Sequence, residues 1–198
     1  MDKNQAYVQN VSIEEIPWYR IGTAYGMASD FPKYFEEIWN MDSLASVEDA
    51  LSEIMNDIEH QGTLWHSTPF AMIFLVRTLE HAVGETEKKQ IADYMITTLL
   101  DFFVLIAECY YDFCGEIEED EAGDEDVLPF FSDMLKEEYL ASENEDEDYD
   151  LSIYEENEDL FYSFWHYSYQ VLLYARPLLE KLENTSYGEK AQELLEML

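Results

Sequence analysis

The chain has 198 residues, of which 47% are apolar and 15% aromatic, which is enough for one sizeable core and excludes disorder throughout. Ten Lys and Arg residues stand against 45 Asp and Glu residues, so the formal net charge is -35 at pH 7. A surface this negative repels phosphate groups, which argues against direct nucleic-acid binding and against an anionic membrane surface.

Helical periodicity recurs along the chain, whereas the alternation typical of strands is almost absent. Residues 31–39 place apolar side chains three and four positions apart, with Asp30 before them as the expected N-cap. A second helix is predicted to open near Ser46 and to stop at Gly62, because glycine suits the residue after a helix. Its expected buried stripe is Val47, Leu51, Ile54, Met55 and Ile58.

The rest of the chain also predicts helices. Thr68 and Pro69 mark the start of a third helix that ends near Gly84. The later predicted segments are residues 87–113, ended by Gly115, residues 127–140, residues 151–182, in which Pro177 could bend or split the helix, and residues 186–198.

Two acidic segments interrupt this pattern, at about residues 116–126 and 142–150. Residues 116–159 hold 21 acidic residues and one basic residue, Lys136. More than half of the net charge therefore lies in less than a quarter of the chain. No linker rich in Pro, Ser or Gly is present, so we predict one all-α domain over residues 1–198 with two acidic loops.

The helices also suggest a repeat. Residues 31–41 pair with 47–61, and residues 69–83 pair with 87–113, at a spacing of roughly 40 residues. This spacing matches the two-helix repeats of HEAT or armadillo superhelices, although an irregular antiparallel bundle can produce it too. The predicted architecture is therefore an α-α superhelix or an irregular helical bundle.

A family resemblance supports the first of these. Residues Trp18, Ala24-Tyr25-Gly26, His60-Gln61-Gly62-Thr63 and Thr68-Pro69 resemble a group of bacterial HEAT-repeat-like proteins with AYG and HQGT motifs. The resemblance covers about residues 18–79, and His66 departs from it. It implies an α-solenoid that binds other proteins and is not an enzyme.

The HQGT motif has a structural interpretation of its own. If His60 and Gln61 form the last turn of the second helix, the histidine can cap free carbonyl groups there, and Gly62 supplies the turn. The alternative is a ligand-binding histidine. We therefore treat Trp18, Tyr25, Gly26, His60, Gln61 and Gly62 as motif residues with an expected structural role.

Catalytic and metal-binding motifs are missing from the sequence. No HExxH, paired CxxC, G-x-S-x-G or Gly-rich phosphate loop is present. Asp146, Asp148 and Asp150 imitate the start of an EF-hand loop, but the required glycine and final glutamate are absent. We expect Cys109 and Cys114 to be packing residues, and we expect no enzyme activity, no bound metal and no cofactor.

The expected location is the cytoplasm. Two cysteines suggest a reducing compartment, and the first residues lack the apolar stretch of a signal peptide. Charged residues also interrupt the longest apolar runs, so no clean membrane span is predicted.

The clustered charge suggests a basic protein partner, since complementary fields accelerate association. The leading hypothesis is an immunity protein that neutralises a basic toxin such as a nuclease. The alternatives are a DNA mimic that inhibits a DNA-binding enzyme, a scaffold whose charge serves only solubility, and a hydrolase with a hidden carboxylate or metal site. The residues expected to bind the partner are Asp120, Asp124, Glu125, Asp126, Glu145, Asp146, Glu147 and Asp148, with Phe130, Tyr149 and Tyr154 as aromatic anchors.

Overall fold

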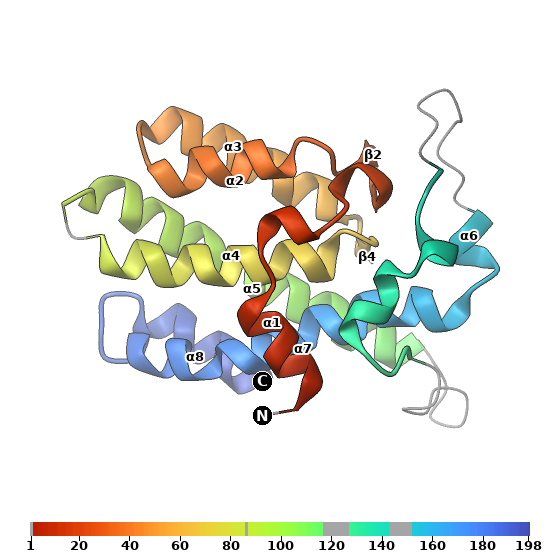
Figure 1. The fold of residues 1–198 in the computed structure, drawn as a ribbon. Helices are drawn as coiled ribbons and strands as arrows, with labels where there is room; N and C mark the ends of the chain where they lie inside the picture. Colours follow the sequence, from red (N-terminus) through yellow and green to blue (C-terminus); the bar gives the residue numbers. More distant parts are fainter. Residues whose placement is uncertain (1, 86, 117–126, 143–151) are drawn as a thin grey trace.

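Three helical pairs form the body of the protein in a computed structural model that describes residues 2–85, 87–116, 127–142 and 152–198. The pairs stack on one another, as Figure 1 shows. Their members are α2 (Phe31–Asn40) with α3 (Leu44–Ile58), α4 (Thr68–Gly84) with α5 (Lys89–Glu116), and α7 (Glu158–Leu182) with α8 (Gly188–Met197). The predicted all-α fold is confirmed.

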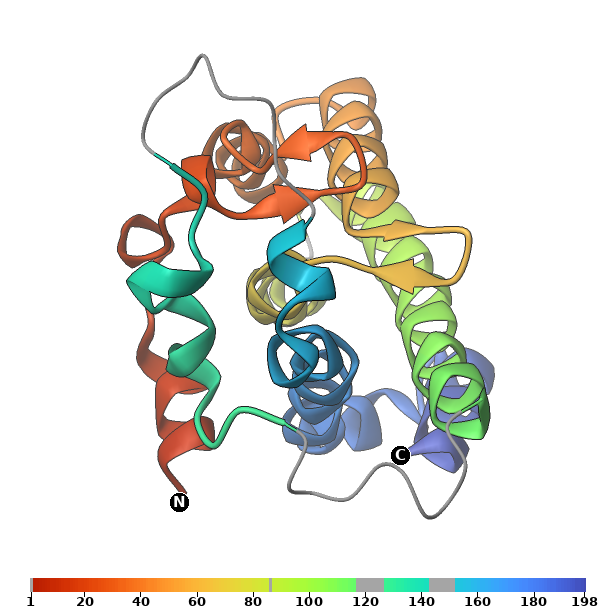
Figure 2. The same ribbon diagram turned by 90° about the vertical axis from the view of Figure 1, so that its right-hand side faces the viewer.

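The stack has two rows of helices. Helix α4 packs against α2 on one side and α7 on the other, while α5 packs between α3 and α8 behind them (Figures 1 and 2). The apolar stripes meet between the rows, where Leu51, Phe103 and Leu172 are fully buried. Burial of such side chains stabilises the fold by roughly 1.5–3 kcal/mol each.

A third, thinner layer crosses the front of the α4 and α7 row (Figure 2). It consists of α1 (Lys3–Asn10), the short 3-10 helices η1 (Ile13–Glu15) and η2 (Trp18–Arg20), and the strap, which we define as residues 127–142. The strap contains η3 (Phe131–Leu135) and η4 (Glu137–Tyr139), and α6 (Ser152–Glu155) precedes α7.

The prediction of one helix over residues 127–140 is wrong, because polar side chains of α7 and α1 bind the strap's backbone. The amide of Leu128 donates to Ser163 Oγ at 2.9 Å, and the amide of Phe131 donates to Asn4 Oδ1 at 2.8 Å. Tyr167 donates its hydroxyl to the Leu128 carbonyl at 2.5 Å. These bonds hold the start of the strap extended as far as Phe131, where η3 begins.

Several predicted helix ends also differ. Ser43, not Ser46, caps α3 by accepting the Ser46 amide at 3.1 Å. Asp30 precedes α2 without a side-chain capping bond. Helix α5 continues through Gly115 to Glu116, and α7 continues through Pro177.

Within the described residues, one helix is long and apolar enough to cross a membrane, the stretch Lys89–Phe113 of α5. Half of its most apolar window is buried inside the protein. Contacts with α3, α4, α7 and α8 surround it, so its packing accounts for its apolar composition.

Candidate functional site

Two β-hairpins project from one end of the helical stack (Figure 2). The first joins β1 (Gly22–Thr23) to β2 (Gly26–Met27), and the second joins β3 (Glu59–His60) to β4 (Thr63–Leu64). In each hairpin a two-residue turn connects the strands, whose pairing is antiparallel.

The second hairpin corrects the prediction for the HQGT motif. Helix α3 ends at Ile58, so His60 lies in a strand and not in a final helical turn. Gln61 and Gly62 form the hairpin turn with φ angles of 54° and 82°. Positive φ at both positions is typical of the tight type I′ turn, for which glycine is well suited.

The AYG and HQGT motifs meet at this end of the protein. The hydroxyl of Tyr25 lies 2.9 Å from His60 Nδ1, and the two rings pack edge to face at 5.1 Å. The Ala24 amide donates to the Asp57 carbonyl at 2.8 Å, which ties the first hairpin to the end of α3. Tyr25 nevertheless remains 67% exposed, so the hairpins hold an accessible aromatic ring in a fixed position.

Carboxylates gather beside the hairpins. Burial, the neighbouring Glu53 and the neighbouring Asp30 raise the pKa of Asp57 to about 6. Burial and the surrounding acids, Asp30 first among them, also raise the pKa of the Tyr34 hydroxyl. Crowded negative charge disfavours each further ionisation, so these groups share one strongly anionic environment. We call Tyr25, His60, Asp30, Glu53 and Asp57 the hairpin-end site.

Trp18, another motif residue, lies inside the protein instead of on this surface. Its ring is 3% exposed and contacts the rings of Phe31 and Phe74 at 5.5 and 5.8 Å. The indole nitrogen donates to the Ile13 carbonyl at 2.8 Å. Gly26, by contrast, has a φ of 145° in the first hairpin, a conformation that residues with a side chain rarely adopt.

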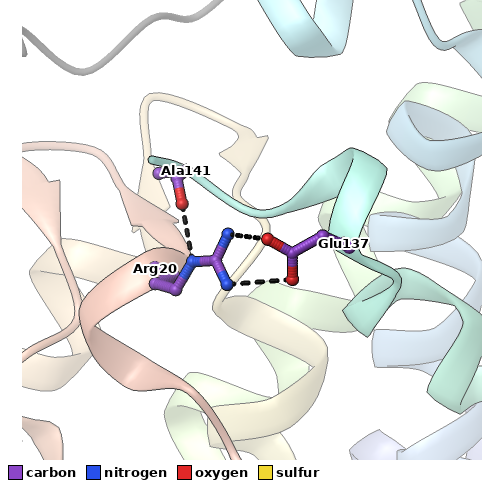
Figure 3. Close-up of polar contacts among 3 residues, drawn as sticks. All are labelled: Arg20, Glu137 and Ala141. Carbon is purple, nitrogen blue, oxygen red and sulfur yellow. Dashed lines mark hydrogen bonds and ion pairs between the residues drawn. The ribbon is translucent and has the colours of Figure 1, made fainter. Parts of the chain in front are cut away.

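An arginine fastens the strap next to the hairpin-end site (Figure 3). The guanidinium of Arg20 donates to both carboxylate oxygens of Glu137 at 3.0 and 2.6 Å, and its Nε donates to the Ala141 carbonyl at 2.6 Å. The hydrogen bond from Arg20 lowers the pKa of Glu137. Arg20 itself is 8% exposed, so the strap buries a cation that it also neutralises.

The predicted partner-binding acids, Asp120, Asp124, Glu125, Asp126, Glu145, Asp146, Glu147 and Asp148, lie outside the described residues, as does Tyr149. The described residues that flank these segments, however, all lie at the hairpin end of the stack: the end of α5, both ends of the strap and the start of α6 (Figures 1 and 2).

The two remaining predicted anchors differ in accessibility. Phe130 is 39% exposed, with the Lys3 ammonium 4.5 Å from its ring centre. Tyr154 is only 8% exposed and packs edge to face against Phe164 at 5.2 Å. The structure therefore places the Tyr154 ring in the core and not on the surface where an anchor would act.

His66 is a buried polar residue whose location was not predicted from the sequence. It is fully buried, its Nε2 bonds to the Met134 carbonyl at 2.8 Å, and its ring stacks on Phe164 at 5.3 Å. Burial lowers the pKa of His66 to about 4, so the ring is neutral at pH 7. It joins the strap to the body and is enclosed by aromatic side chains.

Two kinds of catalytic group can be examined among the described residues, a metal cluster and an activated cysteine. Among them, no group of three or more His, Cys, Asp or Glu side chains is arranged to hold a metal ion. Cys109 is buried as predicted, and burial raises the pKa of its thiol to about 12, which opposes formation of a thiolate nucleophile.

Comparisons with known proteins found no matching family model, no matching curated protein and no matching solved structure. The resemblance to bacterial HEAT-repeat-like proteins therefore stays a prediction.

Proposed function

We propose that this protein binds a basic protein, and that it acts as an immunity protein that neutralises a basic toxin by electrostatic capture. The main support is the hairpin-end site, where the carboxylates of Asp30, Glu53 and Asp57 crowd together beside the hairpin that presents an exposed tyrosine bonded to a histidine. A cationic surface would relieve the repulsion among these carboxylates when it docks.

The position of the acidic segments adds to this support. Residues 116–126 and 142–150 carry 14 carboxylates, and their described flanks lie at the hairpin end. The described flanks of both segments thus lie at the same end of the stack as the two hairpins. A field concentrated at one end steers a basic partner toward that end and accelerates encounter.

Tyr25 supplies a candidate anchor within that field. Aromatic residues are enriched among interface residues that contribute most to binding, and an anchor that is held in place loses little entropy on association. The bond to His60 restrains the Tyr25 ring while most of its surface stays accessible.

The test uses the product of the gene adjacent to the one that encodes this chain, measured by surface plasmon resonance. We expect the association rate constant to fall about tenfold between 50 and 300 mM NaCl. The variant Glu53→Gln with Asp57→Asn should associate more slowly, and Tyr25→Ala should dissociate about tenfold faster.

Two control variants change exposed acidic and apolar side chains at positions away from the hairpin-end site. Glu189→Gln with Glu193→Gln removes two exposed carboxylates of α8, and Val83→Ala truncates an apolar side chain that is 38% exposed near the end of α4, at the other end of the stack. Neither should change the rates by more than about twofold. Absence of a complex at low salt contradicts the proposal, and equal effects of test and control variants contradict the assignment to the hairpin end.

A DNA mimic is the second candidate, because residues 116–126 carry eight carboxylates in eleven positions, and a dense run of negative charge suits a surface that normally binds phosphates. A mimic would compete with duplex DNA for a DNA-binding enzyme. An immunity protein for a toxin that does not bind DNA would show no such competition, so a duplex DNA competitor separates the two.

A further inference from the structure

A groove of about 1000 Å³ lies on the front of the protein, between α2 and the segment that contains η1 and η2. Its floor is aromatic, with Trp18, Phe35 and Phe74 each less than a tenth exposed. The Phe74 ring lies 5.8 Å from Trp18 and 5.5 Å from Phe35, so these rings brace one another. The apolar floor is therefore preformed, as in many binding sites.

Two large aromatic side chains stand exposed on the rim of this groove. Tyr19 is 57% exposed, and Trp39 is 50% exposed. The sequence predicted Trp39 within the buried stripe of α2, but its ring lies outside the core, stacked on the ring of His81 at 4.1 Å with an angle of 9° between the planes. A tryptophan held flat at the rim of an apolar groove is suited to anchor a partner.

Both cations in the groove already have partners. The Arg77 guanidinium donates to the carbonyls of Val8 and Val11 at 2.8 and 2.7 Å. Lys33 lies 3.8 Å from Glu37, the carboxylate one turn further along α2. Glu37 thus offsets the charge of Lys33, whereas Arg77 keeps its positive charge and has its guanidinium fixed on the backbone of the N-terminal segment.

The two rim carboxylates come from opposite walls. Glu14 belongs to η1 and Glu36 to α2, and both side chains are exposed. No hydrogen bond or ion pair involving them occurs among the described residues. A basic side chain placed between Glu14 and Glu36 would thus meet a carboxylate from each wall, in a protein whose net charge is already -35.

The shape of the walls limits what can dock. One wall is the face of α2 from Pro32 to Asn40, about 12 Å long, and the other consists of 3-10 turns. Neither wall offers a free strand edge, so an extended peptide cannot add to a sheet here. A helix laid alongside α2 can insert apolar side chains at positions three and four apart.

We propose that this groove binds an amphipathic helix of a partner protein, with apolar residues against the aromatic floor and with Lys or Arg facing Glu14 and Glu36. This inference extends the proposed function and rests on it for the basic character of the partner. The groove then forms a second contact surface, distinct from the hairpin-end site.

The test uses a synthetic 14-residue amphipathic helix built from Leu and Lys, together with a counterpart built from Leu and Glu. Since neither peptide contains tryptophan, all tryptophan emission comes from the protein, and the difference between the wild type and Trp39→Ala isolates the contribution of Trp39. We expect the Leu–Lys peptide to shift the emission of the exposed Trp39 toward the blue. Trp39→Ala should abolish this shift and weaken binding, measured by calorimetry, about tenfold.

Charge variants separate groove binding from general attraction. Glu14→Gln with Glu36→Gln should weaken binding of the Leu–Lys peptide several-fold, while the matched pair Glu189→Gln with Glu193→Gln on α8 should leave it unchanged within about twofold. Equal weakening by both pairs, equal binding of the Leu–Glu peptide, or normal binding to Trp39→Ala overturns the inference.

The same variants distinguish this inference from the proposed function. If the basic partner binds the wild type and the Trp39→Ala variant equally, while the hairpin-end variants bind it poorly, the groove inference fails and the proposed function stands. If no basic partner binds but the Leu–Lys peptide occupies the groove as expected, the proposed function fails and the groove remains a peptide site.

Discussion

His66 links the pH dependence of stability to one buried side chain. The pKa of His66 is about 4 in the folded protein, compared with about 6.5 for an unperturbed histidine. As pH falls below 6.5 the unfolded chain takes up a proton that the folded chain does not, so stability is lost between about pH 6.5 and pH 4. The full loss attributable to His66 is on the order of 3 kcal/mol.

This prediction can be measured by urea unfolding at pH 7 and pH 5, with His66→Gln as the comparison. A glutamine amide can donate to the Met134 carbonyl but does not titrate. The wild type should lose more unfolding free energy than the variant between the two pH values. Parallel losses in both proteins would show that His66 does not titrate on unfolding.

The shifted pKa of Asp57 has the opposite effect on how stability depends on pH. Its folded pKa of about 6 lies above its ordinary value, so the folded state holds a proton more tightly than the unfolded chain does. Asp57 therefore costs stability at neutral pH, and this cost diminishes as pH falls through 6. A residue that is half-buried among acids at some cost to stability fits a binding role better than a structural one.

At the scale of elements, Arg20 of η2 holds the C-terminal half of the strap in place. Arg20 binds Glu137 and Ala141, and the Ala141 amide in turn donates to the Arg20 carbonyl at 3.0 Å. The substitution Glu137→Gln removes the charge of the partner while it keeps the shape. We therefore expect the amides of residues 136–141 to exchange hydrogen faster, measured by mass spectrometry, because local opening becomes easier.

Glu138→Gln is the matched control, since it removes the neighbouring exposed carboxylate, for which no bond to Arg20 is present. Exchange in the strap should stay at the wild-type rate in this control. If Glu137→Gln also leaves exchange unchanged, the Arg20 contact does not hold the strap, and bonds such as that from Tyr167 to Leu128 suffice.

The elements also show how far the sequence can predict this fold. The apolar stripes of α3, α4 and α5 identify these helices, because a buried helix face requires that spacing. The second hairpin was missed because Gly62 suits the end of a helix as well as a tight turn. The strap was missed because its conformation depends on Ser163 and Asn4, which are distant in the sequence.

The site was predictable only in part. The AYG and HQGT motifs were recognised as residue patterns, but the contact between Tyr25 and His60 depends on two turns that the helical periodicity does not reveal. The exposure of Trp39 was not predicted either, because its spacing places it on the apolar stripe with Ile38 and Phe35. Which part of that stripe stays exposed depends on the positions of η1 and η2, which the spacing does not reveal.

At the scale of the whole molecule, charge repulsion should dominate the response to salt. Forty-five acidic residues face ten basic ones, and most described ion pairs, such as Arg176 with Glu180 at 3.4 Å, are exposed and contribute little to stability. Raising the ionic strength from 10 to 100 mM shortens the screening length from about 30 to about 10 Å. Because screening weakens repulsion across the surface more than it weakens these few pairs, NaCl should raise the thermal midpoint at pH 7.

The pH dependence of that salt effect identifies its source. Near pH 4 many carboxylates take up protons, so less repulsion remains to be screened, and the rise in the thermal midpoint should shrink. Calorimetric scans at both pH values and both salt concentrations provide the measurement. A midpoint that falls with added NaCl at pH 7 would mean that ion pairs outweigh repulsion, and the negative charge would then impose no cost on the folded state that a basic partner could relieve.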